Sequence, residues 1–251
     1  MVLVLGLVIV LEKLGVASPK RFVRGTRLCL LHHATQKSDF DHEDEPEHDD
    51  EKKMQTEILT REFFKRPPLV CAREMLGCTL TWGEAAGVIV ETEAYAEHGD
   101  EAAHSFVRNS ARTFIQDQPA GALYIYLNYG VHWLLNFLTK VDDIRGFVLI
   151  RALQPVAGLD LMRRRRRLDQ DKMLCSGPGK LTQALGITAQ CHGEDFFSIP
   201  GVSLSRNTKR PRVAVDRRVG ITRSPDFEWR FLIANSEYVS LKMRKPASGR
   251  L

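Results

Sequence analysis

The sequence predicts an α+β fold, with helices and strands mixed in a single domain over residues 59–243 of the 251-residue chain. Three observations support this. Short apolar runs of strand length alternate with helical patterns, and turn residues separate them. No internal repeat is present. Hydrophobic residues make up 43% and charged residues 27%, which is ordinary for a globular protein that buries a core.

The first 58 residues do not look like part of that domain. Residues 39–53 (DFDHEDEPEHDDEKK) are too acidic and too poor in apolar side chains to order themselves. The apolar run Val2–Leu11 is ten residues long, whereas a membrane-spanning helix needs roughly 20. We therefore expect residues 1–58 to be an extension, either disordered or the product of a start site set too far upstream, with no membrane partner. Residues 244–251 are expected to be a C-terminal tail.

The domain begins with helical signals. Thr60 is positioned to N-cap a helix that turns Phe63 and Phe64 inward, and Pro67 and Pro68 should stop it. A second helix should end at a glycine, which favours helix C-termini. The helices expected after the first lie at Leu69–Leu76, Ala157–Arg167 and Lys180–Gly186.

The strands follow from β-rich runs. A Gly/Glu/Ala turn joins the first two and predicts a hairpin. One later run, FVLIRA, is apolar except for one arginine, as a central buried strand would be. The expected strands are Cys78–Trp82, Gly87–Thr92, Ala122–Tyr129, Trp133–Phe137, Phe147–Ala152, Val213–Val215, Arg218–Ile221 and Phe231–Ile233.

Charge favours an anionic partner. The net charge is +5, and residues 1–54 hold eight basic and ten acidic residues, so the rest of the chain carries +7. Such a body suits nucleic acid or an anionic surface, although many cytosolic enzymes are as basic. The odd number of cysteines and the lack of a CxxC pair indicate buried or free thiols in a reducing compartment. The five are Cys29, Cys71, Cys78, Cys175 and Cys191.

Two glutamates end an apolar strand in VIVETEAY. Side chains alternate along a strand, so Glu91 and Glu93 should point to the same side, where pocket residues gather. On this segment alone, solvated charges at a strand end remain the simpler interpretation. Arg151 is the single charge in FVLIRALQP, and a buried arginine needs an acidic or phosphate partner. Glu93 is a candidate for that partner.

Metal chemistry is not indicated. Glu91, Glu93, His98 and His104 form no helical pair of the HExxH kind. We therefore expect no metal site, and a lone histidine such as His104 is more often structural.

A cluster of tyrosines indicates contact with a base or a base stack. Tyr124, Tyr126 and Tyr129 fall within six residues, and Gly130 completes turn chemistry after Asn128. Proteins that unstack DNA insert side chains as wedges, and flipped bases are held between aromatic rings. A core position would explain Tyr124 easily, but it explains Tyr129 beside Gly130 poorly.

The segment Ser176-Gly177-Pro178-Gly179-Lys180 leads into a helix. Backbone amides at a helix N-terminus together with a lysine can bind phosphate. The segment lacks the spacing of a nucleotide-binding loop, so contact with a DNA backbone is the better interpretation.

Five stretches, in this order, resemble the alkyladenine (3-methyladenine) DNA glycosylases: VETEAY, DEAAHS, LYIYLNYG, VLIRALQP and CSGPGKLTQALGI. The resemblance runs from about Leu59 to Leu241. It implies a curved antiparallel sheet, surrounding helices and a protruding β-hairpin that inserts into DNA.

The resemblance also implies roles for single residues. Glu93 matches the general base that deprotonates the attacking water, and Arg151 and the backbone at Val219 match groups that hold this water. Residues matching the base pocket are Tyr95, His104, Tyr126 and Asn136, of which Asn136 obstructs the exocyclic amine of guanine. Tyr129 matches the intercalating wedge. Residues expected to contact the DNA backbone are Arg112, Ser176, Gly177 and Lys180.

The implied activity is base-excision repair. Such an enzyme flips an alkylated or deaminated purine out of duplex DNA and hydrolyses the N-glycosidic bond, leaving an abasic site. It is monofunctional and monomeric, needs no cofactor, and is found wherever the genome is, in the cytoplasm or nucleoid of a bacterium or the nucleus of a eukaryote. Neutral lesions would need protonation as well, for which His104 is a candidate.

Departures from the family pattern and two alternatives remain. Residues 110–113 read Ser-Ala-Arg-Thr instead of Thr-Pro-Arg-Asn, and Gln116 and Asp117 replace a common Met-Phe pair, which affects lesion preference and DNA-loop contacts. One alternative is a catalytically inactive damaged-DNA-binding protein. The other is a small hydrolase that uses Glu93 on a non-nucleic substrate.

Overall fold

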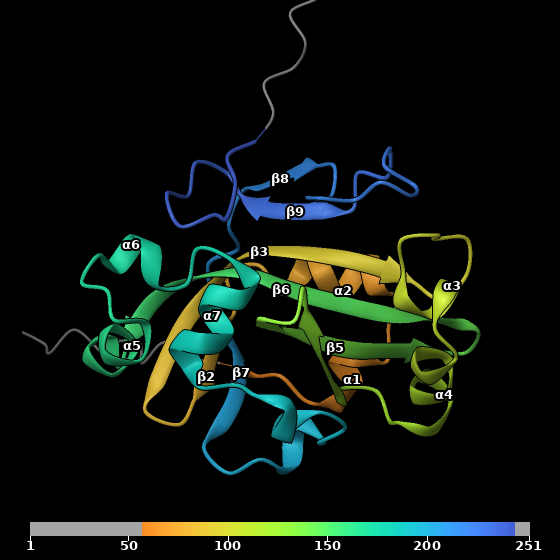
Figure 1. Ribbon diagram of the computed structural model, residues 1–251, viewed down its shortest axis with the longest axis horizontal. Helices are drawn as coiled ribbons and strands as arrows, with labels where there is room; N and C mark the ends of the chain where they lie inside the picture. The colour runs from red at the N-terminus through yellow and green to blue at the C-terminus, as the bar shows by residue number, and fades with distance from the viewer. Residues whose placement is uncertain (1–56, 244–251) are drawn as a thin grey trace, which may run out of the picture. The chain divides into compact units, whose positions relative to one another are not determined.

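The computed structural model describes residues 57–243, which form one mixed domain around an antiparallel sheet (Figure 1). Val2–Leu11, the acidic stretch and the C-terminal tail lie outside the described residues. The strands are β1 (Glu57–Ile58), β2 (Thr79–Trp82), β3 (Ala85–Ala96), β4 (Leu123–Asn128), β5 (His132–Val141), β6 (Ile144–Ala157), β7 (Val202–Arg206), β8 (Val213–Asp216) and β9 (Arg230–Ile233). The helices are α1 (Arg61–Phe64), α2 (Pro68–Glu74), α3 (His104–Val107), α4 (Asn109–Asp117), α5 (Leu159–Arg166), α6 (Asp171–Leu174) and α7 (Pro178–Leu185), with 3₁₀ turns η1 (Ala189–Cys191) and η2 (Phe196–Ser198).

The sheet runs in the order β1-β7-β2-β3-β6-β5-β4, and every pairing is antiparallel. The fold class predicted from the sequence is therefore confirmed. Residues 57 and 58, which the sequence assigned to the extension, pair with β7 as β1.

Strands β3 and β6 are the longest and lie at the centre. The first part of β3 pairs with β2, its residues 91–93 pair with β9, and β6 runs along its other edge. The β3–β6 register shifts on either side of Glu91, an irregularity that re-aims side chains at this point. Glu91 and Glu93 thus lie on a central strand that pairs with other strands along both of its edges.

Strands β4 and β5 form the hairpin expected from the tyrosine-rich run. Asn128 pairs with His132, which leaves Tyr129, Gly130 and Val131 as the connecting turn. Tyr129 has φ 50° and Gly130 has φ 72°. The left-handed conformation at Gly130 explains why a glycine stands there, because other residues rarely adopt it.

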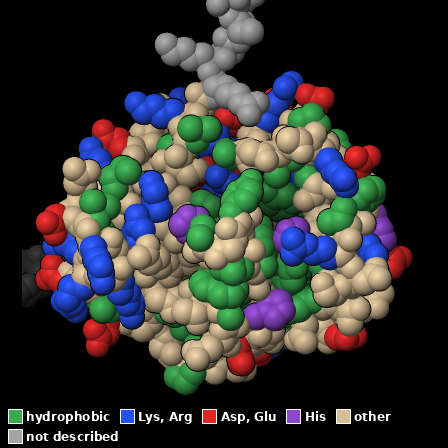
Figure 2. All heavy atoms as spheres, in the orientation of Figure 1, with side chains coloured by type: hydrophobic (Ala, Val, Ile, Leu, Met, Phe, Trp, Pro, Cys, Tyr) green, Lys and Arg blue, Asp and Glu red, His purple; other side chains and the backbone are tan. Residues whose placement is uncertain are grey.

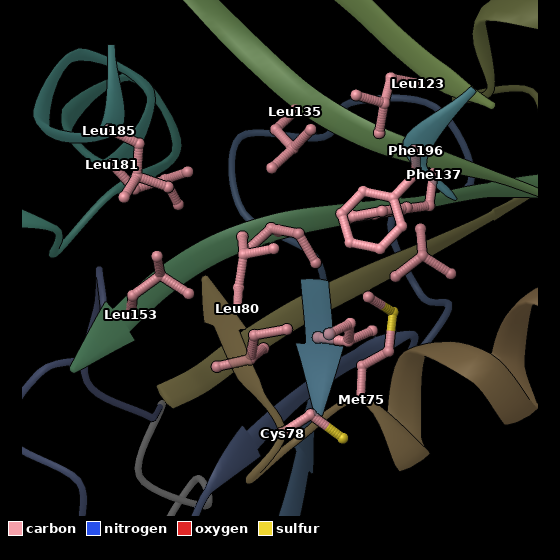
Figure 3. Close-up of a cluster of buried hydrophobic side chains, with 14 of the residues drawn as sticks. Met75, Cys78, Leu80, Leu123, Leu135, Phe137, Leu153, Leu181, Leu185 and Phe196 are labelled. Carbon is pink, nitrogen blue, oxygen red and sulfur yellow. The ribbon is translucent and has the colours of Figure 1, made fainter. Parts of the chain in front are cut away.

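One large hydrophobic cluster holds the helices to the sheet (Figure 3). Met75 at the end of α2, Phe137 of β5 and Leu181 of α7 all belong to it, and the Phe137 and Phe196 rings meet edge to face at 5.0 Å. A smaller cluster packs α4 against β4, β5 and β6 through Phe114, Tyr124 and Phe147, among others. Tyr95 and Tyr126 lie against this second cluster, so it supports the side of the sheet that carries the tyrosines.

Several expected elements are placed differently. Arg218–Ile221 is a turn region and not a strand. The Arg218 side chain in this segment is buried in an ion pair with Asp100. Pro68 was expected to stop the first helix, but it is the first residue of α2, a position that suits proline. Thr60 stands at the N-cap of α1, but its side chain makes no cap hydrogen bond. Strands β1 and β7 and helices α3, α4 and α6 had no clear sequence signal.

The described cysteines Cys71, Cys78, Cys175 and Cys191 are free thiols, as expected. Between residues 57 and 243, no helix has the length and apolar character required to cross a bilayer.

Candidate active site

Glu91 and two candidate site residues follow one another along one face of β3. Glu91, Glu93 and Tyr95 stand at alternate positions, and successive residues of a strand point to opposite faces, so all three project to the same side. Both glutamates are fully buried. Their interpretation as solvated strand-end charges is therefore wrong.

Glu93 is held by donors on both carboxylate oxygens. The Val219 amide donates to Oε1 at 2.7 Å. The Tyr95 hydroxyl donates to Oε2 at 2.8 Å, and Arg151 Nη1 donates to the same oxygen at 3.2 Å. Because three different segments supply these donors, the carboxylate has a fixed orientation.

Arg151 on β6 bridges the two glutamates. Its Nε donates to Glu91 at 3.0 Å, while its Nη1 reaches Glu93. The expected partnership with Glu93 is therefore present, and a second carboxylate shares it. Glu91 also accepts hydrogen bonds from Arg230 Nε at 2.8 Å and from both the amide and the hydroxyl of Ser240. Glu91 thus anchors Arg151 from the side away from Glu93.

A pocket of 160 Å³ opens beside this network. Tyr95 forms one part of its wall, and its hydroxyl is the group that bonds to Glu93. Burial and the adjacent Glu93 carboxylate raise the pKa of Tyr95 well above its usual value, so the hydroxyl keeps its proton. The lining residues are Tyr95, Ala102, His104, Tyr124, Tyr126, Asn128, Asn136, Phe147 and Ile221.

His104 begins α3 and faces the tyrosines of β4. Its ring centroid lies 4.1 Å from that of Tyr126, and its Nδ1 is 3.1 Å from the Tyr124 hydroxyl. Burial, helped by the nearby Arg108, lowers the pKa of His104 to about 4. The ring is therefore neutral at pH 7 and has no extra proton to give to a leaving base.

Asn136 on β5 is a buried polar residue that lines the pocket. It is 3% exposed, and its Nδ2 donates to the Tyr124 carbonyl at 3.1 Å and more weakly to that of Leu134. These bonds fix the side chain, so it cannot easily move aside for a bulkier ligand. The structure thus brings all four expected pocket residues together.

Tyr129 lies at the tip of the β4–β5 hairpin with 89% of its surface exposed, and Val131 beside it is 68% exposed. Tyr129 is therefore not a core residue. Two exposed apolar side chains on one tight turn are unusual for a surface that contacts only water.

The segment that begins α7 packs against the start of the hairpin strand β5. A Cβ atom on Gly179 would lie 2.7 Å from the Cβ of His132, and Thr182 donates to the Trp133 carbonyl at 2.7 Å. Lys180 Nζ donates to the Ser176 hydroxyl at 3.3 Å. The segment of Ser176, Gly177 and Lys180, which are expected at the DNA backbone, thus leads into a helix that packs at the turn end of the hairpin.

Arg112 on α4 forms hydrogen bonds to residues of α3 and α4. Its guanidinium donates to the carbonyls of Ser105 and Phe106 on α3 and to the side chain of Asn109. These bonds join α3 to α4. Contact between Arg112 and DNA stays a prediction.

No group of three or more metal-ligating side chains occurs among residues 57–243.

Two residues that bind Glu91, Arg230 and Ser240, had no assigned role in the sequence analysis. Arg230 directly precedes an apolar strand run, and it pairs with both Glu91 and Asp216. A lone arginine beside an apolar run is the same signal that identified Arg151, so Arg230 could have been found in this way. Ser240 gives no such signal, because it reaches Glu91 only through the path of the C-terminal segment.

A buried carboxylate with fixed donors thus lies next to an aromatic pocket, an arrangement that suits a flat ring system. The family model of methylpurine-DNA glycosylase matches residues 62–237. A protein of Rhodopseudomonas palustris (strain ATCC BAA-98 / CGA009) named as a 3-methyladenine DNA glycosylase is 44% identical over 183 residues, which cover 73% of this chain and 88% of that protein. Similarly named proteins of Agrobacterium fabrum and Nitrosospira multiformis are each 41% identical, over 73% of this chain and 93% and 94% of their own lengths.

The chain belongs to the methylpurine-DNA glycosylase family and is accordingly a DNA glycosylase, a hydrolase of N-glycosyl bonds that acts on DNA.

Proposed function

We propose that this glycosylase removes alkylated or deaminated purines from double-stranded DNA, with Glu93 as the general base. The observation that carries the proposal is the contact between Glu93 and Tyr95. The carboxylate is fully buried, and the tyrosine that bonds to it also forms the pocket wall. A base in this pocket would therefore place its glycosidic bond close to the carboxylate.

The reaction needs one water molecule. Glu93 takes a proton from the water, the water oxygen bonds to C1′ of the sugar, and the bond from C1′ to the purine nitrogen breaks. A 3-methylated adenine carries a positive charge in DNA and leaves as a neutral base, so no further acid is required. General-base assistance of this kind contributes about 10²–10⁴-fold. Arg151 and the backbone at Val219 are proposed to hold the water as well as the carboxylate.

The pocket residues are proposed to bind the extruded base by stacking. Tyr95 would cover one face of the base, and His104 with Tyr126 would cover the other. A flipped base is commonly read by stacking between aromatic side chains. Because His104 is neutral, we do not assign it a proton-donating role, and neutral lesions should be excised more slowly than cationic ones.

Contact with a duplex is supported by the hairpin and its surroundings. Tyr129 is proposed to fill the space that the flipped nucleotide leaves, and Lys180 with the amides near Ser176 to contact phosphates. Figure 2 shows Lys and Arg side chains gathered on the left of the view, over α5, whose sequence is LDLMRRRR. Such side chains suit the DNA backbone. We propose that the protein acts as a monomer wherever the genome is located.

The direct test is release of free purine. Wild-type protein should release 3-methyladenine from methylated duplex DNA, measured by chromatography of the released bases. Borohydride should trap no protein–DNA adduct, because water and not a lysine is the nucleophile. A trapped adduct with strand cleavage would refute the hydrolytic mechanism. Tight binding without base release would instead indicate a damaged-DNA-binding protein, which no observation favours while Glu93 and Arg151 are both present and paired.

A further inference from the structure

Next to Tyr95, which lines the pocket, lies an ion pair that none of these roles uses. Arg218 donates to both carboxylate oxygens of Asp100, at 2.6 and 2.8 Å. Their side chains are 1% and 0% exposed. Desolvating two charges is costly, so a buried pair of this kind adds little to stability compared with apolar residues of the same volume. Its surroundings indicate another purpose.

On one side, the pair supports the Tyr95 ring. The guanidinium carbon of Arg218 lies over this ring, 4.6 Å from its centroid, and it is 5.3 Å from the centroid of Trp229. Arg218 Nη1 also donates to the carbonyl of Ala94, the residue before Tyr95. The planar cation therefore packs against the ring that forms the pocket wall, and cation–π attraction holds the two together.

On the second side, the pair fixes the loop that leads to His104. Asp100 accepts a hydrogen bond from the amide of Ala102 at 3.1 Å and one from Ala96, the last residue of β3, at 3.3 Å. The Asp100 carbonyl accepts the amide of Ala103 at 3.1 Å. One carboxylate thus joins the end of β3 to the loop before α3, and β3 and α3 both contribute lining residues to the pocket, Tyr95 and His104.

On the third side, the pair holds a donor to the catalytic carboxylate. Arg218 directly precedes Val219, whose amide donates to Glu93. This segment follows β8 without strand pairing, so its side-chain anchors determine where the amide points. Ile221, three residues after Arg218, lines the pocket.

We propose that Arg218 and Asp100 are positioning residues that couple base binding to water activation. The pair sets the Tyr95 wall, the loop before His104 and the Val219 amide relative to Glu93. The inference rests on the proposed function and extends it. A displacement of about 1 Å in such an arrangement can cost about 10²-fold in rate.

The test replaces both charges at once. In Arg218→Met/Asp100→Asn, uncharged side chains of similar size keep the core filled, and thermal unfolding reports whether the variant folds. The matched control is Arg61→Met/Asp195→Asn, which removes a 2.6 Å ion pair between α1 and the segment at η2, outside the pocket. Excision is followed in single turnover with excess enzyme, so that rate and amplitude are separated. A 2-aminopurine next to the lesion reports flipping independently of chemistry.

We expect the double variant to excise the lesion about 10- to 100-fold more slowly than the wild type, while the final fraction excised stays the same. The 2-aminopurine signal should be smaller, and the affinity for undamaged duplex should be unchanged. Arg218→Lys, which keeps the charge but not the planar contact with Tyr95, should fall between the double variant and the wild type. The control should match the wild type in rate.

The inference is overturned if the folded double variant matches the wild type in rate and flipping. It is also overturned if the double variant excises a smaller fraction of the lesion at an unchanged rate. The same holds if the Arg61→Met/Asp195→Asn control slows excision by the same factor as the double variant. A wild type that flips the lesion but releases no base refutes the proposed function instead, and the flipping signal of the variants still decides the role of the ion pair.

Discussion

Replacement of Tyr129 by serine tests the proposed wedge, because the structure separates its effect on DNA from its effect on folding. The side chain is 89% exposed, so the free protein should lose no more than about 0.5 kcal/mol of stability. Serine must adopt the same φ of 50°, so strain in the turn is not relieved. In the complex, loss of one stacked ring should cost about 1–3 kcal/mol. This corresponds to roughly 5- to 150-fold in affinity for the flipped state.

The assay compares hypoxanthine in a duplex with the same lesion in a single strand, under single-turnover conditions. Tyr129→Ser should slow excision from the duplex by the factor above, whereas the single strand should be affected much less because no stack opposes flipping. A 2-aminopurine beside the lesion should report less unstacking. Tyr129→Phe keeps the ring and should behave as wild type.

Ile144→Ser is the matched control, because it removes another exposed apolar side chain, at the β5–β6 turn of the same sheet. This variant should leave duplex excision unchanged. If Tyr129→Ser also leaves both excision and fluorescence unchanged, Tyr129 is no wedge.

Three further predictions concern buried polar groups. Glu91→Gln should cost about 3–5 kcal/mol of stability, since Arg151 and Arg230 lose a shared charged partner, and an unchanged Tm would contradict this. Because its folded pKa is about 4, His104 stays neutral from pH 6 to 8, so its titration should put no inflection in the excision rate there. Its contribution to stability is present above its ordinary pKa of 6.5 and is lost as pH falls towards 4, so His104→Gln should lose less stability over that range. Asn136→Ser should admit guanine-type lesions while keeping alkyladenine excision, and an unchanged substrate profile would place Asn136 outside the selecting contact.

Strand alternation and a lone charge in an apolar run drew attention to Glu93 and Arg151, whereas their roles were implied only by the resemblance to a known family. Glu93 and Arg151 were found because each stands beside or within a run that otherwise reads as buried strand. Their partnership, however, involves Glu91 equally, because an irregular register brings Arg151 between the two glutamates. The sequence pattern predicts which residues of a strand share a face, but it does not predict a shift in the register between two strands.

Long-range contacts account for what the sequence could not predict. Arg218 was expected on a strand, yet its side chain is used to pair with Asp100, 118 residues away. Strand β1 has only two residues and exists because β7 pairs with it. Local propensity carries no information about partners so distant in the chain.

The most direct test of the account is the effect of Glu93→Gln on binding and excision, measured on the same lesion duplex. Glutamine keeps the shape of the side chain but accepts no proton from water, so lesion binding should be retained while the single-turnover rate falls by about 10²–10⁴-fold. Glu97→Gln is the matched control, since this buried glutamate pairs with Arg145 at 2.6 Å and does not line the pocket. Excision by Glu93→Gln within about tenfold of wild type would contradict the assignment of Glu93 as the general base.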